Sequence, residues 1–191
     1  MLVPWQEEAI SQIFGNVDES GSRTIEMAYL EVPKKAGKSE LAAGLALLVL
    51  LTTRTRGCQV YGAASATRQA MNVYRAACKM VEQSTVLKTK LRVLRGTNRI
   101  LKRSDPDSFY AAVAADGDFG DGVNPACVIA DEIHRWKTRK QLDNWDVRPA
   151  ASGCIPTAIR IRQPQLGLAS MVADGGRWED FRLKWSPAIS S

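Results

Sequence analysis

Histidine is almost absent from this chain of 191 residues, and its cysteines are not grouped. It has one histidine and four cysteines without C-x-x-C spacing, namely Cys58, Cys78, Cys127 and Cys154. A structural zinc site is therefore not expected, because it needs several such ligands at close spacing. We expect the cysteines to be reduced, mostly buried thiols of a cytosolic protein.

Apolar runs long enough to cross a membrane are also lacking. The longest, Leu41 to Leu51, is too short to span a bilayer. The N-terminal stretch MLVPWQEEAI is acidic and amphipathic, unlike a signal peptide. No membrane partner is expected.

The composition favours one soluble globular domain. Hydrophobic residues make up 45% of the chain and charged residues 24%, which is enough apolar material for an ordinary core. The net charge of +6 permits contact with nucleic acid but does not establish it.

Helix and strand patterns alternate along the chain. Helices are expected at 4–14, 40–51 and 66–84, and strands at 23–32, 57–65, 98–104, 108–115 and 126–132. Thr67 or Ser65 is the expected cap of the third helix. After Val147 the periodicity weakens, and a short strand at 158–162 is the one element expected there. The alternation predicts a parallel, doubly wound sheet, whose ligands bind at the carboxyl ends of the strands.

The stretch VPKKAGKS, Val32 to Ser39, is similar to a phosphate-binding loop between a strand and a helix. In the pattern G-x-x-x-x-G-K-[ST], Gly37 lets the backbone approach a phosphate, Lys38 reaches the β- and γ-phosphates, and Ser39 binds Mg²⁺. Val32 replaces the first glycine, so a turn into a buried helix with a solvated lysine pair is the alternative. The residues expected to cradle ATP are Lys35, Ala36, Gly37, Lys38 and Ser39.

An acid pair ends the strand CVIADE. Asp131 is placed to hold Mg²⁺ through water, and Glu132 to act as the general base that polarises the attacking water. The alternative is an acid pair that caps the next helix. In the first helix, Gln6 has the amide that suits an adenine edge. A surface glutamine beside a core tryptophan, Trp5, is the other interpretation.

Four stretches in this order resemble the large terminase subunit of tailed bacteriophages: PWQEEAISQIFG, VPKKAGKSELAAGLAL, YGAASATRQAMNVYRAA and DGDFGDGVNPACVIADEIHRW. The resemblance covers about residues 2–147. It implies an α/β fold of the P-loop NTPase-like (RecA/ASCE) type, three-layer α/β/α with a mainly parallel sheet, incomplete at the C-terminus. It also implies a Mg²⁺-dependent ATPase that drives double-stranded DNA into a procapsid.

Further expectations follow from the resemblance. The partners would be double-stranded DNA, the small terminase subunit, the portal protein and further copies in a homo-oligomeric ring, in the cytoplasm of the bacterial host. Lys34 stands where such proteins commonly have a catalytic arginine finger; lysine carries the charge but lacks the planar fork of arginine. For His134, a role in coupling hydrolysis to DNA movement and a plain packing role are equally weighted.

The chain departs from the family after its acid strand. Residues 1–147 are expected to form the ATPase domain, whereas 148–191 show no Thr/Ser-rich coupling motif and no nuclease aspartates. We therefore expect no nuclease domain and hypothesise a frameshifted or disordered tail. A non-catalytic prophage remnant that at most binds nucleotide is the alternative function. A helicase-like ATPase is a weaker alternative, because the chain has no room for a second motor domain.

Overall fold

One mixed sheet forms the body of the protein in the computed structural model, which describes residues 2–19, 27–31, 35–114, 125–132, 157–162 and 182–184. The strands are β1 (Met27–Glu31), β2 (Gln59–Ala64), β3 (Leu91–Leu94), β4 (Arg99–Lys102), β5 (Asp105–Ala114), β6 (Pro125–Asp131), β7 (Thr157–Arg162) and β8 (Arg182–Lys184). The helices are α1 (Pro4–Gly15), α2 (Lys38–Thr52), α3 (Thr67–Gln83) and α4 (Thr85–Lys90), with a 3-10 turn at Arg95–Thr97.

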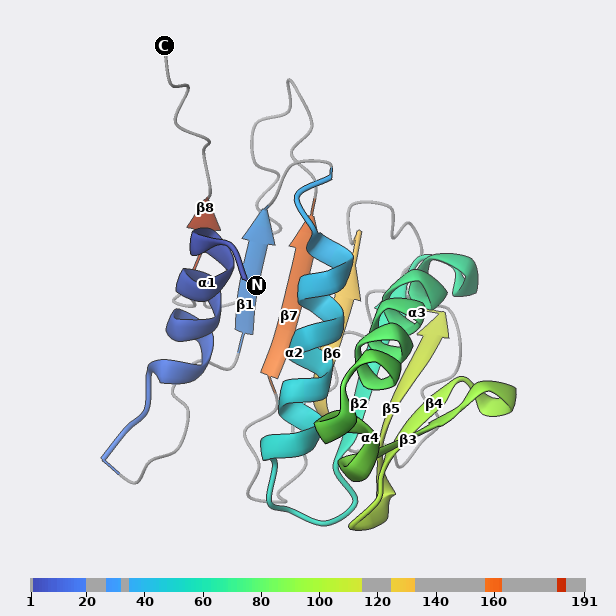
Figure 1. Ribbon diagram of the computed structural model, residues 1–191. Coiled ribbons are helices and arrows are strands. Elements are labelled where there is room, and N and C mark those ends of the chain that lie inside the picture. The colour runs from blue at the N-terminus through green and yellow to red at the C-terminus, as the bar shows by residue number, and fades with distance from the viewer. Residues whose placement is uncertain are drawn as a thin grey trace.

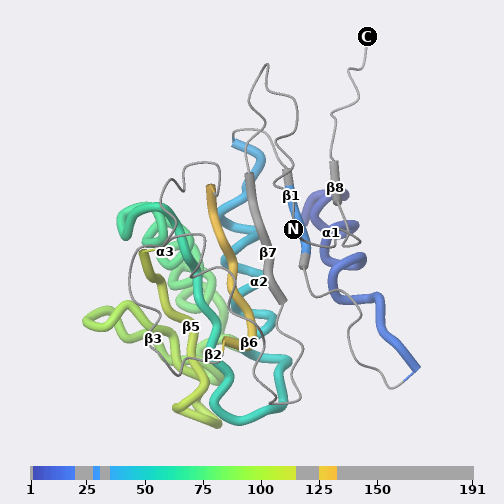
Figure 2. Tube along the Cα trace, turned by 180° about the vertical axis from the view of Figure 1, so that it is seen from behind, coloured from blue at the N-terminus to red at the C-terminus, as the bar shows by residue number. Residues whose placement is uncertain are grey.

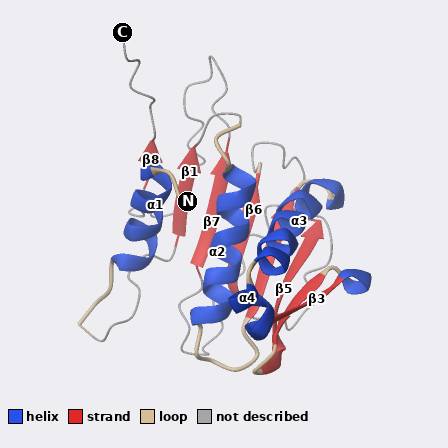
Figure 3. Ribbon diagram, in the orientation of Figure 1, coloured by secondary structure: helices blue, strands red, loops and turns tan. Residues whose placement is uncertain are grey.

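The strand order is β3-β4-β5-β2-β6-β7-β1-β8 (Figures 1 and 3). In this order, each pair of neighbouring strands from β5 through β2, β6, β7 and β1 to β8 is parallel. Strands β3 and β4 form an antiparallel hairpin at one edge, and β4 is antiparallel to β5. The predicted α/β class with a mainly parallel sheet is thus confirmed. The expected helices and strands that lie in the described part of the chain are found within a few residues of their expected bounds.

Strand β7 lies between β1 and β6 and is parallel to both. The predicted short strand at 158–162 is therefore confirmed, and β8 pairs with the other side of β1. In register, Glu31 pairs with Arg162 and Asp131 with Ile161, so the carboxyl ends of β1, β6 and β7 meet at one edge. Both β7 and β8 come from beyond residue 147. The division of the chain at that residue stays a prediction.

The described helices lie on one face of the sheet, in front of it in Figure 1 and behind it in Figure 2. Helix α2 is buried nearly all round, as its continuous apolar sequence predicts. Helix α3 is amphipathic, and its buried positions follow helical spacing: Ala70, Val73, Tyr74, Ala77, Cys78 and Val81. In the part of the chain that the structure describes, no helix is long and apolar enough to cross a membrane. The predicted burial of the thiols is confirmed for Cys58, Cys78 and Cys127.

A missing side chain in β2 makes room for a large one from β5. The Tyr110 side chain is completely buried, and its ring lies over Gly62. A Cβ atom at Gly62 would stand 2.5 Å from Tyr110 Oη and 3.1 Å from Cε2. Among the described residues Tyr110 Oη has no hydrogen-bond partner, so packing and not a polar contact holds the ring here. Gly62 is thus a packing requirement of the core.

Replacing Gly62 with alanine should lower the free energy of unfolding by about 1–3 kcal/mol, because the buried ring must shift to admit a methyl group. Thermal unfolding measures the loss. Gly44→Ala is the matched control: a Cβ there meets nothing within 4 Å, and alanine in a helix interior should stabilise by about 0.5–1 kcal/mol. Adding Tyr110→Phe to Gly62→Ala should recover part of the loss, since it removes the nearest atom. Wild-type stability of Gly62→Ala would contradict this account of the packing.

Candidate active site

The loop between β1 and α2 turns through left-handed backbone at its end. Lys35 has φ 64° and Gly37, the residue before α2, has φ 76°. Leu41 N–H donates to the Gly37 carbonyl over 2.9 Å, which is the first bond of the helix. The helix offers no acceptor to the N–H groups of its first turn, Lys38 to Glu40. These N–H groups and the positive end of the helix dipole make this end of α2 suited to an anion.

Gln6 lies against this loop, although it comes from α1. The side chain is buried, and its Nε2 would stand 3.3 Å from a Cβ at Gly37. Its Oε1 accepts a hydrogen bond of 3.2 Å from Val3 N–H and closes the first turn of α1. Gln6 is therefore not the surface glutamine of the alternative interpretation. Its contact with adenine stays a prediction.

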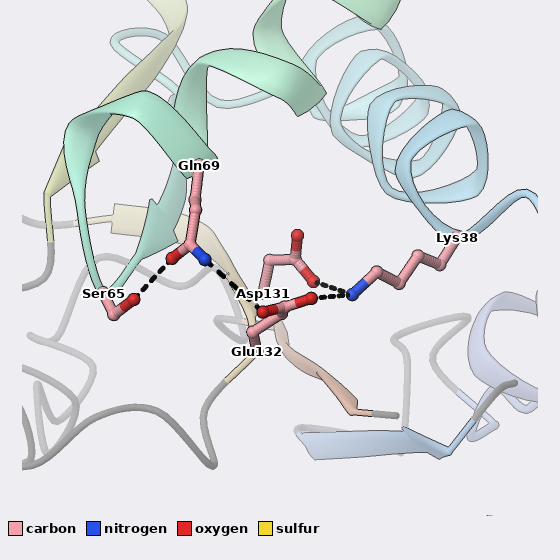
Figure 4. A network of polar contacts seen from close by, with 5 residues as sticks. All are labelled: Lys38, Ser65, Gln69, Asp131 and Glu132. Atoms are coloured by element: carbon pink, nitrogen blue, oxygen red, sulfur yellow. Dashed lines mark hydrogen bonds and ion pairs between the residues drawn. The ribbon is translucent and has the colours of Figure 1, made fainter. Parts of the chain in front are cut away.

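Lys38 bridges Asp131, the last residue of β6, and Glu132, the residue after it (Figure 4). Its Nζ lies 2.7 Å from Glu132 Oε1 and 3.2 Å from Asp131 Oδ1, and all three side chains are at most 15% exposed. Lys38 and Glu132 are 94 positions apart in the sequence, and the parallel sheet brings them to one edge. The geometry agrees with the expectation that the loop and the acid pair both lie at carboxyl ends of parallel strands.

The backbone of Glu132 is left-handed, with φ 52°. Such a conformation costs a residue with a side chain about 1–2 kcal/mol. The neighbouring strand residue Asp131 is extended, so the chain turns sharply between the two acids. This turn lets two consecutive carboxylates reach the same ammonium group, whereas successive side chains of a straight strand point to opposite faces. Strain of this kind clusters at functional sites.

The Asp131 carboxylate is poorly solvated. Burial raises its pKa above the ordinary value, and the charge of Lys38 opposes that rise. Its Oδ1 is buried, and its contact with Lys38 is the ion pair of 3.2 Å. Among the described residues no other group donates a hydrogen bond to this oxygen, so it keeps acceptor capacity inside the site.

From the β2–α3 junction Gln69 contacts Glu132, and Ser65 contacts Gln69 (Figure 4); the sequence singled out neither for chemistry. Gln69 Nε2 donates to Glu132 Oε2 over 3.5 Å, and Ser65 Oγ donates to Gln69 Oε1. The expected capping role of Ser65 or Thr67 is wrong: the cap position is Ala66, without a side-chain bond. The Ser65 hydroxyl bonds the Gln69 amide instead. The available signal was that these residues follow a predicted strand of the parallel sheet, at the edge where ligands of such sheets bind.

A match to a protein-family model shows which family the chain belongs to. The family model described as "Terminase large subunit, ATPase domain" matches residues 4–146. The chain belongs to this family. The resemblance to large terminase subunits is thereby confirmed.

Solved structures of phage terminases share the fold. The large terminase of bacteriophage HK97 superposes with a TM-score of 0.68 at 24% identity, over 85% of this chain and 33% of that one. The ADP complex of a large terminase from a thermophilic bacteriophage gives 0.61 at 12% identity, over 84% and 39%. The ATPase domain of the Thermus phage P74-26 large terminase gives 0.53 at 20%, over 74% and 61%. The chain thus spans about a third of the HK97 protein. No curated protein sequence matches it.

Most of the site residues predicted for this terminase-family chain are described by the structure. Lys38, Asp131 and Glu132 are in contact, and Gln6 and Gly37 adjoin them through the loop. Lys35 is exposed, and Ala36 and Ser39 are half-buried beside them. Lys34 and His134 lie outside the described residues, and their roles stay predictions.

Proposed function

We propose that this chain is the ATPase motor part of a phage terminase large subunit, which hydrolyses ATP to drive double-stranded DNA into a procapsid. The observation that carries the proposal is the convergence of Lys38, Asp131 and Glu132 at one sheet edge in a chain of the terminase ATPase family. The alternative for the loop, a turn into a buried helix with a solvated pair at Lys34 and Lys35, gives no reason for a largely buried Lys38 that contacts two acids.

The residues present fit a nucleotide with its metal ion. Gly37 has φ 76°, and a Cβ there would lie 3.3 Å from the Gln6 amide, so glycine suits this turn into the end of α2 that favours an anion. Mg²⁺ in such sites takes one or two carboxylates together with phosphate oxygens and water, and the spare acceptor capacity of Asp131 Oδ1 suits that role. Among the described residues no group of three or more His, Cys, Asp or Glu side chains forms an all-protein metal cage. Bound Mg²⁺ would neutralise charge on the phosphates.

Each side chain has a role in this proposal. Lys38 would leave the acid pair and neutralise the β- and γ-phosphates, while the Ser39 hydroxyl and Asp131 would hold the metal ion. Glu132, released from Lys38, accepts a proton from the attacking water. Lys34 compensates the negative charge of the transition state, the backbone of Lys35 and Ala36 lines the phosphates, and Gln6 contacts adenine with its amide.

The whole motor needs partners. We propose that these are double-stranded DNA, the small terminase subunit, the portal protein and further copies of the chain in a ring, in the cytoplasm of the bacterial host. Mg²⁺ dependence of hydrolysis belongs to the same proposal.

The test is ATP turnover by the purified chain with Mg²⁺ and with the metal chelated by EDTA, beside direct titration of nucleotide binding. We expect slow turnover that needs Mg²⁺. Saturable ATP binding without turnover would support the remnant alternative. Absence of both binding and turnover, in a chain whose circular dichroism shows it folded, would overturn the proposed function.

A further inference from the structure

The stretch AASATRQA, Ala63 to Ala70, belongs to a motif of the terminase resemblance but has no role in the site proposed above. Strand β2 pairs directly with β6, and Ala64 stands in register with Asp131. The junction after β2 therefore lies beside the turn at Glu132. Helix α3 begins there, with Gln69 in its first turn.

Hydrogen-bond chemistry fixes which way the Gln69 amide points. The ionised Glu132 carboxylate can only accept, so the amide group that faces it must be Nε2, a donor. Oε1 then faces Ser65, whose hydroxyl must donate to it. Reversing the amide would set two acceptors against each other at Glu132. Ser65 thus holds Gln69 in the orientation that Glu132 needs.

The two oxygens of Glu132 have different partners. Lys38 holds Oε1 over 2.7 Å, and Gln69 holds Oε2 over 3.5 Å from the opposite side (Figure 4). The first contact must break if Lys38 is to reach a phosphate, whereas the second does not involve the loop. Gln69 can therefore keep its contact with Glu132 after Lys38 has turned away.

We propose, on the basis of the proposed function, that Gln69 is a positioning residue for Glu132. It holds the carboxylate in the direction needed to accept a proton from water, and Ser65 sets the orientation of its amide. Because Gln69 lies in the first turn of α3, a shift of that helix would change the position of the base. The site then includes the β2–α3 junction, besides α1, the phosphate loop and the end of β6.

Turnover kinetics test the proposal. Gln69→Ala should lower kcat by about 10- to 100-fold, the usual range for a residue that orients another, with the affinity for ATP unchanged. Ser65→Ala should give a smaller loss, and Ser65→Thr, which keeps the hydroxyl, should restore the rate. Gln83→Ala, at an exposed glutamine near the other end of α3, is the matched control and should leave kcat unchanged.

A double-mutant cycle separates positioning from a structural role. If Gln69 acts through Glu132, then Gln69→Ala added to Glu132→Gln should change the residual rate by less than about twofold. If Gln69→Ala lowered the rate by the same factor in the wild type and in Glu132→Gln, the proposal would be overturned. A weakened ATP affinity with unchanged kcat would also overturn it. If Glu132→Gln turns over like the wild type, Glu132 is not the base and the positioning role of Gln69 fails with it, whereas the proposed function fails only if the wild type neither binds nor hydrolyses ATP.

A measurement without turnover decides the contact if the chain proves inactive. The side-chain NH₂ signals of Gln69 in a ¹⁵N–¹H NMR spectrum of the nucleotide-free chain should shift in Glu132→Ala and in Ser65→Ala. They should not shift in Gln83→Ala. Unshifted Gln69 signals in Glu132→Ala would show that the two side chains do not meet, and the inference would be wrong whatever the activity.

Discussion

Replacing Lys38 with methionine should abolish nucleotide binding and also destabilise the nucleotide-free chain. Methionine keeps the length of the side chain but leaves Asp131 and Glu132 facing each other without their shared cation. The two carboxylates are 10% and 15% exposed, so water can solvate their unpaired charges only slightly. Breaking a buried ion pair costs about 3–5 kcal/mol, and the residual exposure places this case near 3 kcal/mol. For a domain of this size Tm should fall by about 6–12 °C.

The loss of stability in Lys38→Met should depend on pH. Burial already raises the pKa of Asp131, and removal of Lys38 takes away the charge that opposes the rise. Between the ordinary carboxyl value of 3.8 and the raised pKa, the folded variant binds more protons than the unfolded chain. Its stability therefore falls as pH rises through that window. The deficit relative to wild type should be smallest near pH 4 and largest at neutral pH.

Thermal unfolding of Lys38→Met and wild type across this pH range measures the effect. Lys79→Met is the matched control, because Lys79 is an exposed lysine on α3 whose loss should not change Tm. Equal Tm values for Lys38→Met and wild type at neutral pH would show that Lys38 does not hold the acid pair in solution.

The sequence predicted the layout of this fold because its strongest signals are periodic. The apolar run of α2 and the alternation of strands and helices are local patterns. The place of the site follows from the rule that ligands bind at the carboxyl ends of parallel strands, where β6 ends in its acids. The hairpin of β3 and β4 beside α4 was only partly predicted. Its short elements carry too few apolar positions for a period to be detected.

Side-chain networks were harder to predict than elements. Nothing in the spacing shows that Ser65 bonds Gln69 instead of capping α3, because a serine before a helix suits both roles. The pairing of Lys38 with Glu132 depends on the left-handed turn at that residue, which is a tertiary feature. Gln6 was placed in the right helix, but its burial against Gly37 depends on how α1 packs.

Replacing Glu132 with glutamine should stop turnover while leaving ATP bound. The proposed general base is lost, and loss of such a group lowers kcat by about 10²- to 10⁴-fold. Binding should persist because Lys38, Ser39 and Gly37 are intact. The amide also holds Lys38 less strongly than the carboxylate that now lies 2.7 Å from its Nζ, which leaves the ammonium freer to meet a phosphate. We therefore expect ATP affinity equal to or above that of wild type.

Stability separates this variant from Lys38→Met. Asp131 still lies 3.2 Å from Lys38 Nζ, so no charge is left without a partner in Glu132→Gln, and Tm should change little. On the same preparations, titration gives the ATP affinity, single-turnover hydrolysis gives the rate and thermal unfolding gives Tm. Exposed Glu82→Gln on α3 serves as the control for removal of one negative charge. Weakened ATP binding with an unchanged rate would assign Glu132 to nucleotide binding and not to proton transfer.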